Sequence, residues 1–319
     1  MQIKTKMKHL IAALSAAALC SAQAQQVTKF VTGVAPGASV DAVTRTVAES
    51  MADVLKRTIV VDNRVGASGN IAAEYVARAP ADGTVALVTY NIHSVVGSLY
   101  ANLRFDPVND FRAVGVIATT PYAVVANPKL PGSTLKEVLE LAKAQGRSLT
   151  FASTGLGSPQ HLSMERLKEK TGVDIRMVHY KSAAPGQIDV IAGHVDFMLS
   201  TIGFCEPQVK AGKLKVLAVT NEGRLSQFPN APTVAESGYK GLINDGWYAL
   251  MLPAKTPPAI VKRYNDALNQ ALASPTVREK FQAMVLTPRP GTSELLDSWV
   301  RDEAAIAKQL ITSLNIKPE

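Results

Sequence analysis

The chain has 319 residues, of which 47% are hydrophobic and 19% charged, and its formal net charge is +8. This composition is typical of a folded globular protein and excludes an intrinsically disordered chain. Basic residues are scattered and do not alternate with aromatic residues, so nucleic acid is not an expected partner.

The N-terminal 24 residues have the three regions of a secretory signal peptide: lysines, a short apolar stretch and Ala-Gln-Ala at 22–24. The apolar stretch is shorter than the roughly 20 residues of a membrane span. We therefore predict cleavage after Ala24 and a periplasmic mature protein, whose charge falls to +5 because three lysines are removed. A lipoprotein modified at Cys20 is the alternative, which Leu19 disfavours because a small residue normally precedes the lipidated cysteine.

Strand-like and helix-like stretches then alternate along the chain. The expected strands are 27–32, 58–63, 84–90, 114–127 (two segments meeting at Pro121), 149–153, 174–180, 195–200 and 215–220. The expected helices are 41–56, 69–79, 133–146, 159–172, 186–193, 205–212, 258–273, 275–285 and 293–314. This order predicts an α/β protein with largely parallel sheets.

The last three helices have no strands of their own and are expected to pack on the first sheet. The sequence therefore predicts a discontinuous first lobe, 25–122 plus 226–319, and a second lobe, 123–225. Two crossings, near Pro121 and at 229–233, would join the lobes around a cleft that can hinge. Cys205 is the one cysteine left in the mature chain, and we expect a buried small hydrophobic residue there.

Two glycine-bearing turns each lead into a helix: FVTGVAPGASVDAV at 30–43 and FASTGLGSPQH at 151–161. Such a turn presents free backbone N–H groups and the positive end of a helix dipole, which suits an anion. Two of them suggest one anionic ligand held from two sides.

No stretch of the sequence matches the residue spacing of a known catalytic or cofactor-binding motif. Neither turn carries the lysine of a phosphate-binding loop, GLGSPQ lacks the third glycine of a dinucleotide fingerprint, and GASGN fails the G-x-S-x-G pattern. His93, His161, His179 and His194 show no metal-ligand spacing. We expect no metal, no cofactor and no catalysis, with an exported hydrolase as the disfavoured alternative.

Three residues near the turns have two interpretations each. Asp41 either caps its helix or selects a ligand ammonium or amide group. His161 either contacts or orients the ligand or packs beneath the loop. Ser158 before Pro159 is typical of an N-cap with proline at the first helical position.

Several blocks, in order, resemble a known family: PGASVD, VVDNRVGASGNIAAEYVARAPADGT, FASTGLGSPQHL, VHYKSAAPGQIDVIAGHVDFML and WYALMLPAKTP. From about Val27 onward the chain is similar to the extracytoplasmic solute receptors of tripartite tricarboxylate transporters, the TctC or Bug family. The resemblance implies a type II periplasmic binding-protein fold and a carboxylate ligand held by backbone amides and small hydroxyls. It also implies delivery of the ligand to a two-component membrane permease. We expect a monomer, because a two-lobed receptor that docks on a permease needs the rims of its cleft free.

The same resemblance implies a first-lobe grip at 33–41 and a second-lobe grip at 153–161. The expected ligand-binding residues are Val34, Ala35, Gly37, Ala38, Ser39, Asp41, Asn91, Ser153, Thr154, Gly155, Ser158, Gln160, His161, Ser182, Ala183 and Ser200.

The chain departs from the family pattern at the first turn, where Pro-Phe is usual in place of Gly33–Val34 and glycine in place of Ala38. Loss of an aromatic residue at Val34 predicts room beside the ligand, and hence a carboxylate larger than aspartate or glutamate. Ser182 replaces a usual glycine and Ser200 a usual acidic residue. A sensor that presents its closed form to a sensor kinase would share the fold and cleft and stays an open alternative.

Overall fold

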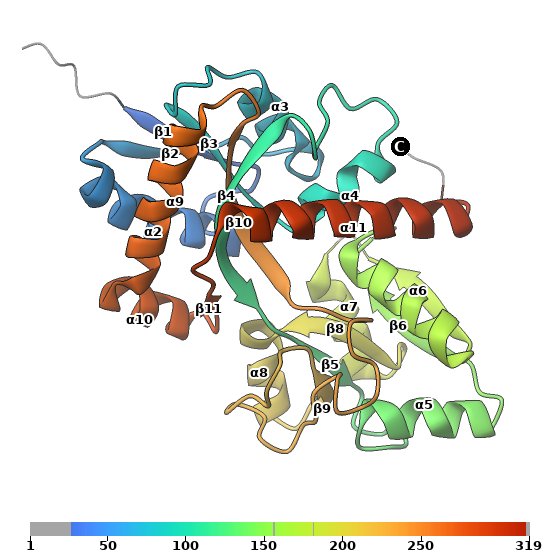
Figure 1. The fold of residues 1–319 in the computed structure, drawn as a ribbon. Helices are drawn as coiled ribbons and strands as arrows, with labels where there is room; N and C mark the ends of the chain where they lie inside the picture. The colour runs from blue at the N-terminus through green and yellow to red at the C-terminus, as the bar shows by residue number, and fades with distance from the viewer. Residues whose placement is uncertain (1–26, 156, 181, 317–319) are drawn as a thin grey trace, which may run out of the picture.

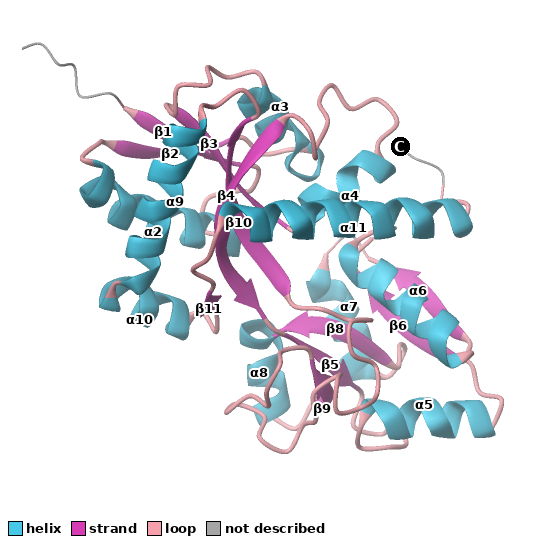
Figure 2. Ribbon diagram, viewed as in Figure 1, coloured by secondary structure: helices cyan, strands magenta, loops and turns pink. Residues whose placement is uncertain are grey.

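The computed structural model describes residues 27–155, 157–180 and 182–316. The expected signal peptide and its cleavage after Ala24 lie outside the described residues. Within these ranges two β-sheets lie one above the other, each covered by helices on both faces (Figures 1 and 2).

The first sheet has six strands in the order β11-β4-β10-β3-β1-β2. They are β1 (Thr28–Thr32), β2 (Ile59–Asn63), β3 (Val85–Tyr90), β4 (Phe111–Thr120), β10 (Gly246–Pro253) and β11 (Thr287–Pro288). Strands β1, β2 and β3 run parallel, while β10 is antiparallel to β3 and β4. The sheet is therefore mixed, and its parallel part comprises the strands that alternate with helices in the N-terminal sequence.

Helices cover both faces of this sheet. One face carries α2 (Ser39–Leu55), α9 (Pro258–Ala273) and α10 (Pro275–Ala283). The other carries α3 (Asn70–Ala77), which follows the short 3-10 turn η1 (Ala67–Gly69), together with α4 (Ile92–Leu99) and α11 (Ser293–Ser313). Side chains alternate between the faces: Phe30 packs in the core under α2 and α9, and Val31 in the core under α3 and α11. The three terminal helices thus pack on the first sheet, as the sequence predicts.

Strand β10 is not among the strands expected from the sequence. All eight of its residues are buried, because it lies between β3 and β4 with helices on both faces. Trp247, Ala249 and Met251 face one core, while Tyr248 and Leu250 face the other. A strand that is apolar on both faces has no period-2 pattern, which explains why it escapes detection.

The second sheet has five strands in the order β7-β6-β8-β5-β9. They are β5 (Tyr122–Ala126), β6 (Leu149–Ser153), β7 (Ile175–His179), β8 (Phe197–Thr201) and β9 (Lys215–Val219). Strands β6, β7 and β8 are parallel, and β5 is antiparallel to β8 and β9. The covering helices are α5 (Leu135–Ala144) and α6 (Pro159–Thr171) on one face, and α7 (Ala183–Ala192) and α8 (Ile202–Lys210) on the other.

Two chain segments join the sheets. Strand β4 ends at Thr120 and β5 begins at Tyr122, so the first crossing lies at Pro121. The segment before β10 packs with the second sheet, because Phe228 and Ile243 lie in its two cores. We therefore place the second crossing at residues 244–246, later than the 229–233 expected from the sequence.

The two lobes also touch through apolar side chains. Leu162 of α6 packs in one cluster with Val95 of α4 and Leu310 of α11. Nearby, Gly157 lies against the side chain of Leu99, so closely that an added Cβ would lie 2.0 Å from the Leu99 Cδ2 atom. Helix α6 of the second lobe is therefore seated on two helices of the first.

No helix in the described part of the chain combines the length and apolarity needed to cross a bilayer. Cys205 is fully buried in the core under α7 and α8, and burial raises the pKa of its thiol to about 12. The expectation of a buried small hydrophobic residue at this position is confirmed.

Replacement of Gly157 by alanine tests the contact between the lobes. Gly212 is the matched control, because its φ of +67° is close to the +70° of Gly157 but an added Cβ would meet open space. Both substitutions carry the same left-handed backbone strain of about 1 kcal/mol. We expect Gly157→Ala to lower the melting temperature more than Gly212→Ala and to increase the radius of gyration measured by small-angle X-ray scattering. Equal effects of the two substitutions would contradict close packing of the second lobe against the Leu99 side chain.

Candidate functional site

The carboxyl ends of the parallel strands in both sheets converge on one region between the lobes. In the first sheet, β3 ends beside the start of β10, since Tyr90 pairs with Tyr248. In the second, β8 ends beside the start of β5, since Thr201 pairs with Tyr122. Only Pro121 separates β4 from β5, so these two edges meet at the crossing. Ligands of open α/β sheets bind outside the carboxyl ends of the strands.

Helices that follow these strands begin at the same edges and direct their N-termini to this region. They are α2 and α4 from the first sheet, and α6, α7 and α8 from the second. Each N-terminus offers backbone N–H groups without an intrahelical partner and a partial positive charge. The region between the lobes is therefore built to favour an anion.

Asp41 fixes the first glycine turn. It lies in the first turn of α2, is 2% exposed, and its Oδ2 accepts a hydrogen bond of 2.9 Å from the Gly37 backbone N–H. The same oxygen pairs with Arg45 Nε at 2.9 Å, and Oδ1 accepts from Asn63 Nδ2 at 2.8 Å. With these partners Asp41 orders the loop that leads into α2. It does not cap the helix, whose N-cap Ala38 receives no side-chain hydrogen bond, but its carboxylate lies in the first turn, where it complements the helix dipole.

These contacts also set the charge of Asp41. Burial alone would raise its pKa, but hydrogen bonds from Arg45, Gly37 and Asn63 outweigh burial and lower the pKa of the carboxyl group to about 2. Asp41 is therefore ionised at neutral pH, and its negative charge is compensated within the loop by Arg45.

The remaining first-turn residues divide into exposed and packed positions. Ala35, Gly37 and Ser39 are exposed and Ala38 is half-buried, so their backbone is accessible for a ligand. Gly37 has φ +85°, which favours glycine at that position. Val34 is half-buried and packs against the core under α2. The rest of the side chain is exposed, so the expectation of room beside the ligand at Val34 stays a prediction.

Hydrogen bonds among small hydroxyls order the second turn. Ser158 caps α6, because its Oγ accepts from the His161 backbone N–H at 3.2 Å, and Pro159 follows as the first helical residue, as the sequence predicts. Ser153 is buried and donates to the Gly155 carbonyl oxygen at 3.0 Å. Thr154 donates to Gln160 Oε1 at 3.2 Å. The turn is thus held by its own side chains before any ligand contact is made.

His161 fixes the second glycine turn as Asp41 fixes the first. Its Nδ1 accepts a hydrogen bond of 2.9 Å from the Gly157 backbone N–H, which assigns the proton of the neutral ring to Nε2. Nε2 lies 3.6 Å from Glu165 Oε1, and the ring packs edge-on against His179 with centroids 4.9 Å apart. Burial, with repulsion from His179 and Lys168, lowers the pKa of His161 to about 4, so the ring is neutral at pH 7. The geometry places His161 beneath the loop as an orienting residue.

The other expected residues lie at the same edges. Ser182 is exposed at the N-cap of α7, followed by Ala183. Ser200 is buried at the end of β8, where its hydroxyl donates to the Thr201 carbonyl oxygen at 3.3 Å. Asn91 precedes α4 without a side-chain cap interaction.

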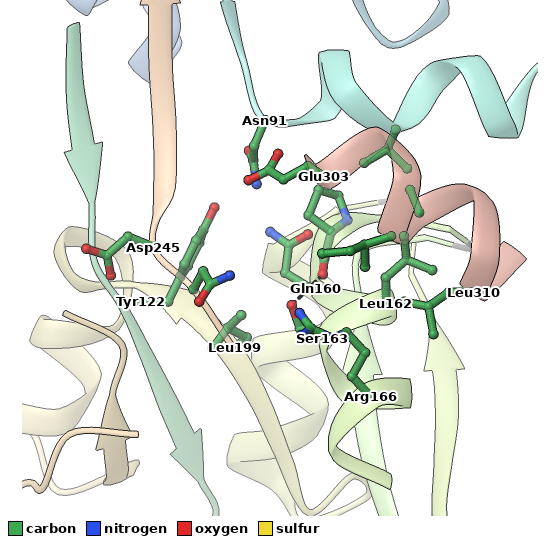
Figure 3. Close-up of a pocket in the computed structure, with 15 residues that line it drawn as sticks. Asn91, Tyr122, Gln160, Leu162, Ser163, Arg166, Leu199, Asp245, Glu303 and Leu310 are labelled. Atoms are coloured by element: carbon green, nitrogen blue, oxygen red, sulfur yellow. Dashed lines mark hydrogen bonds between the residues drawn. The ribbon is translucent and has the colours of Figure 1, made fainter. Parts of the chain in front are cut away.

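A recess between the lobes adjoins the second turn, since Pro159 and Gln160 line it (Figure 3). Of the residues expected from the sequence, it is lined by Asn91 from the first lobe and Gln160 from the second. It also exposes Tyr122 and Asp245 from the two crossings and Glu303 from α11. No sequence signal points to these last three, because they are separated by more than 50 residues and belong to no local motif.

Comparison with known proteins shows what this arrangement is. The model of the tripartite tricarboxylate transporter family receptor matches residues 43–316. The chain belongs to this receptor family. The protein BugT of Bordetella pertussis is 33% identical over 270 residues, covering 84% of this chain and 83% of BugT.

Solved receptors share the fold. A Rhodopseudomonas palustris protein in a structure with adipate has a TM-score of 0.75 and 30% identity, covering 93% of this chain and 100% of its own. MatC of Rhodopseudomonas palustris, with bound malate, has a TM-score of 0.70 and 28% identity, covering 89% and 98%. A TctC solute-binding protein from Polaromonas, at 23% identity and a TM-score of 0.80, supports the fold alone. The receptor thus has the expected two-lobed periplasmic binding-protein fold. The described residues hold no group of three or more His, Cys, Asp or Glu that could bind a metal.

The role of Asp41 predicts how the stability of the receptor depends on pH. Its folded-state pKa of about 2 lies below the ordinary 3.8, so its ionised form stabilises the folded state at pH values above about 4. We expect Asp41→Asn to cost roughly 1–2 kcal/mol at pH 7, and this cost to shrink as the pH falls below 4. Urea unfolding between pH 7 and pH 3 measures it, with the exposed Asp53→Asn on the same helix as control. A cost that stays constant over this range would contradict the ion-pair account.

Proposed function

We propose that the protein is a periplasmic receptor that binds a small organic acid through its carboxylate and delivers it to a tripartite tricarboxylate-type transporter. The observation that carries the proposal is the set of helix N-termini at the facing edges of the two sheets. Such N-termini hold an anion without a charged side chain.

The electrostatics of the two turns fit a carboxylate ligand. Asp41 is the one acidic group of the first turn, and its charge is matched by Arg45. In the second turn His161 is neutral and the hydroxyls of Thr154 and Ser158 lie beside the backbone amides. A carboxylate therefore meets donors from both turns and no uncompensated negative charge.

The comparisons support the same ligand class. One similar receptor was solved with adipate and MatC with malate, which are both carboxylates. The family is named for its transporter, which supports a membrane transporter as the receiving partner.

Two crossings between the lobes supply the motion that capture and release need. Pro121 and residues 244–246 are the two segments that join the sheets. Rotation about them opens the region between the turns, and a ligand that contacts both turns stabilises the closed form by its differential affinity. A membrane partner that recognises the closed form would then receive loaded receptor only.

Thermal unfolding with a panel of small acids tests the proposal. The purified receptor is first unfolded and refolded to remove any bound ligand, and each carboxylate is then compared with its own amide and alcohol. A ligand at 100 times its dissociation constant adds about 2.7 kcal/mol to the free energy of unfolding, which raises the melting temperature clearly.

We expect at least one carboxylate to raise the melting temperature while its amide does not. If only uncharged compounds raise the melting temperature, the proposal that the two turns bind a carboxylate would be contradicted. Isothermal titration calorimetry with the best acid then confirms a single site per chain.

A further inference from the structure

Val285, in the turn between α10 and β11 of the first lobe, packs against the second lobe. Its half-buried side chain lies against the core under α7 and α8, and among the described residues it is the one first-lobe side chain that does so. Leu225 of the second lobe packs against the same core. Both residues line a recess of about 550 Å³ beside Pro121, so the lobes are not in continuous contact here.

The backbone conformation of Val285 disfavours valine. Its φ is +56°, in the left-handed region, where a β-branched side chain is a rare outlier. The turn has the hydrogen bonds of a Schellman motif at the end of α10. The Val285 N–H donates to the Gln282 carbonyl oxygen at 3.0 Å, and the Leu286 N–H donates to the Phe281 carbonyl oxygen at 2.8 Å. Glycine is the usual residue at this position of the motif.

Other helices of this chain do end on a left-handed glycine. Helix α6 ends at Gly172 with φ +66°, and α7 ends at Gly193 with φ +84°. At the end of α10 the chain instead carries a side chain that the local backbone disfavours. Strained residues persist where surrounding contacts hold them, and they are typical of regions that switch between conformations. The contact with the other lobe is the feature of Val285 that offsets its strain.

Strand order places this contact across the hinge from the two glycine turns. In the first sheet, β11 borders β4 on the edge away from β1, the strand that leads into the first turn. In the second sheet, β9 borders β5 on the edge away from β6, the strand that leads into the second turn. Figure 1 shows β11 on one side of β4 and α6 on the other. A rotation at Pro121 that brings the turns together therefore separates Val285 from the second lobe.

The turns are open to solvent in the arrangement that includes the Val285 contact. Ala35, Gly37 and Ser39 of the first turn are exposed, and so is Ser182 at the start of α7. No ion pair between described residues joins the two lobes. Apolar packing between the lobes, such as that of Val285, therefore weighs in the balance between open and closed forms.

We propose that the Val285 contact is a latch that holds the receptor open in the absence of ligand and thereby lowers its affinity for the ligand. Closure has to break the contact, so the free energy of the contact is subtracted from the free energy of binding. The inference rests on the proposed function in one respect, namely that the closed form is the one that binds the acid.

Two substitutions at Val285 separate the contact from the backbone strain. Val285→Gly removes the side chain and relieves the strain, whereas Val285→Ala removes most of the contact and keeps a side chain in the left-handed conformation. The glycine variant is therefore expected to have the higher melting temperature of the two. Both variants are expected to bind the acid about fivefold more tightly, because a half-buried valine no longer favours the open form. Calorimetry with adipate and with malate, the acids found with two similar receptors, measures this affinity.

Lys56→Gly is the matched control for the backbone. Lys56 follows α2 in the same left-handed conformation, with φ +52°, and it is exposed at the opposite end of α2 from the first turn. This substitution is expected to leave the affinity unchanged. A purely structural role of Val285 predicts the same result for Val285→Gly and Val285→Ala, with effects on the melting temperature alone.

Double electron–electron resonance compares the same variants without any ligand. Spin labels at Asp53→Cys on α2 and Lys170→Cys on α6 occupy exposed positions on the two lobes. Cys205, the one cysteine of the predicted mature chain, is buried and stays unlabelled. Loss of the Val285 contact is expected to populate a second distance between the labels in the ligand-free receptor. A bound acid is expected to enrich that same distance in the unmodified chain.

Failure of this inference is distinguishable from failure of the proposed function. Unchanged or weaker binding by either Val285 variant overturns the latch and leaves carboxylate binding standing. An unchanged ligand-free distance distribution overturns it as well. If no acid of the wider panel binds the unmodified receptor, the proposed function fails, and the distance distribution alone then decides whether Val285 holds the lobes open.

Discussion

The direction of the parallel strands is the constraint on which the candidate site depends. Strands that run parallel end at one edge of their sheet, and the helices that follow them begin there. In this receptor β1 and β3 of one sheet and β6, β7 and β8 of the other place their helix N-termini around the same region. The crossing at Pro121 brings the two edges together. The region between the sheets therefore receives the partial positive charge of several helix N-termini, which favours an anion.

Each lobe secures its glycine turn in the same way. A glycine N–H donates to a side chain four residues later, in the first turn of the following helix: Gly37 to Asp41 and Gly157 to His161. The two acceptors differ in charge, but each is compensated or neutral where it lies, Asp41 through Arg45 and His161 through burial. The side chains thus order the loops without adding charge to the site, and the remaining N–H groups stay available.

Two kinds of connection hold the lobes together: the two linking segments and the packing of α6 against the first lobe. Pro121 and residues 244–246 join the sheets, and Leu162 and Gly157 of the second lobe rest on α4 and α11 of the first. Because α6 carries the second turn at its N-terminus, its packing on the first lobe also positions that turn. The recess lies between the packed α6 helix and the linking segments. Its lining residues therefore come from both lobes and from positions at or next to both segments.

Much of the local structure could be predicted from the amino-acid sequence. The alternation of strands and helices, the break at Pro121, and the start of α6 at Ser158–Pro159 follow from residue type and spacing. The two glycine turns could be located for the same reason, since glycine and helix start signals are local. Strand β10 and helix α4 were missed, because a strand buried on both faces and an eight-residue helix without a capping side chain carry no distinctive period.

Only the tertiary structure decided which distant residues share the cleft. Tyr122, Asp245 and Glu303 meet in one recess because β5 and β10 begin at adjoining edges and α11 crosses beside them. By itself the sequence determined the order of the elements and the place of the two glycine turns, because these depend on neighbours along the chain. The lining of the recess depends on strand pairing and helix packing between residues more than 50 positions apart, which no local pattern encodes.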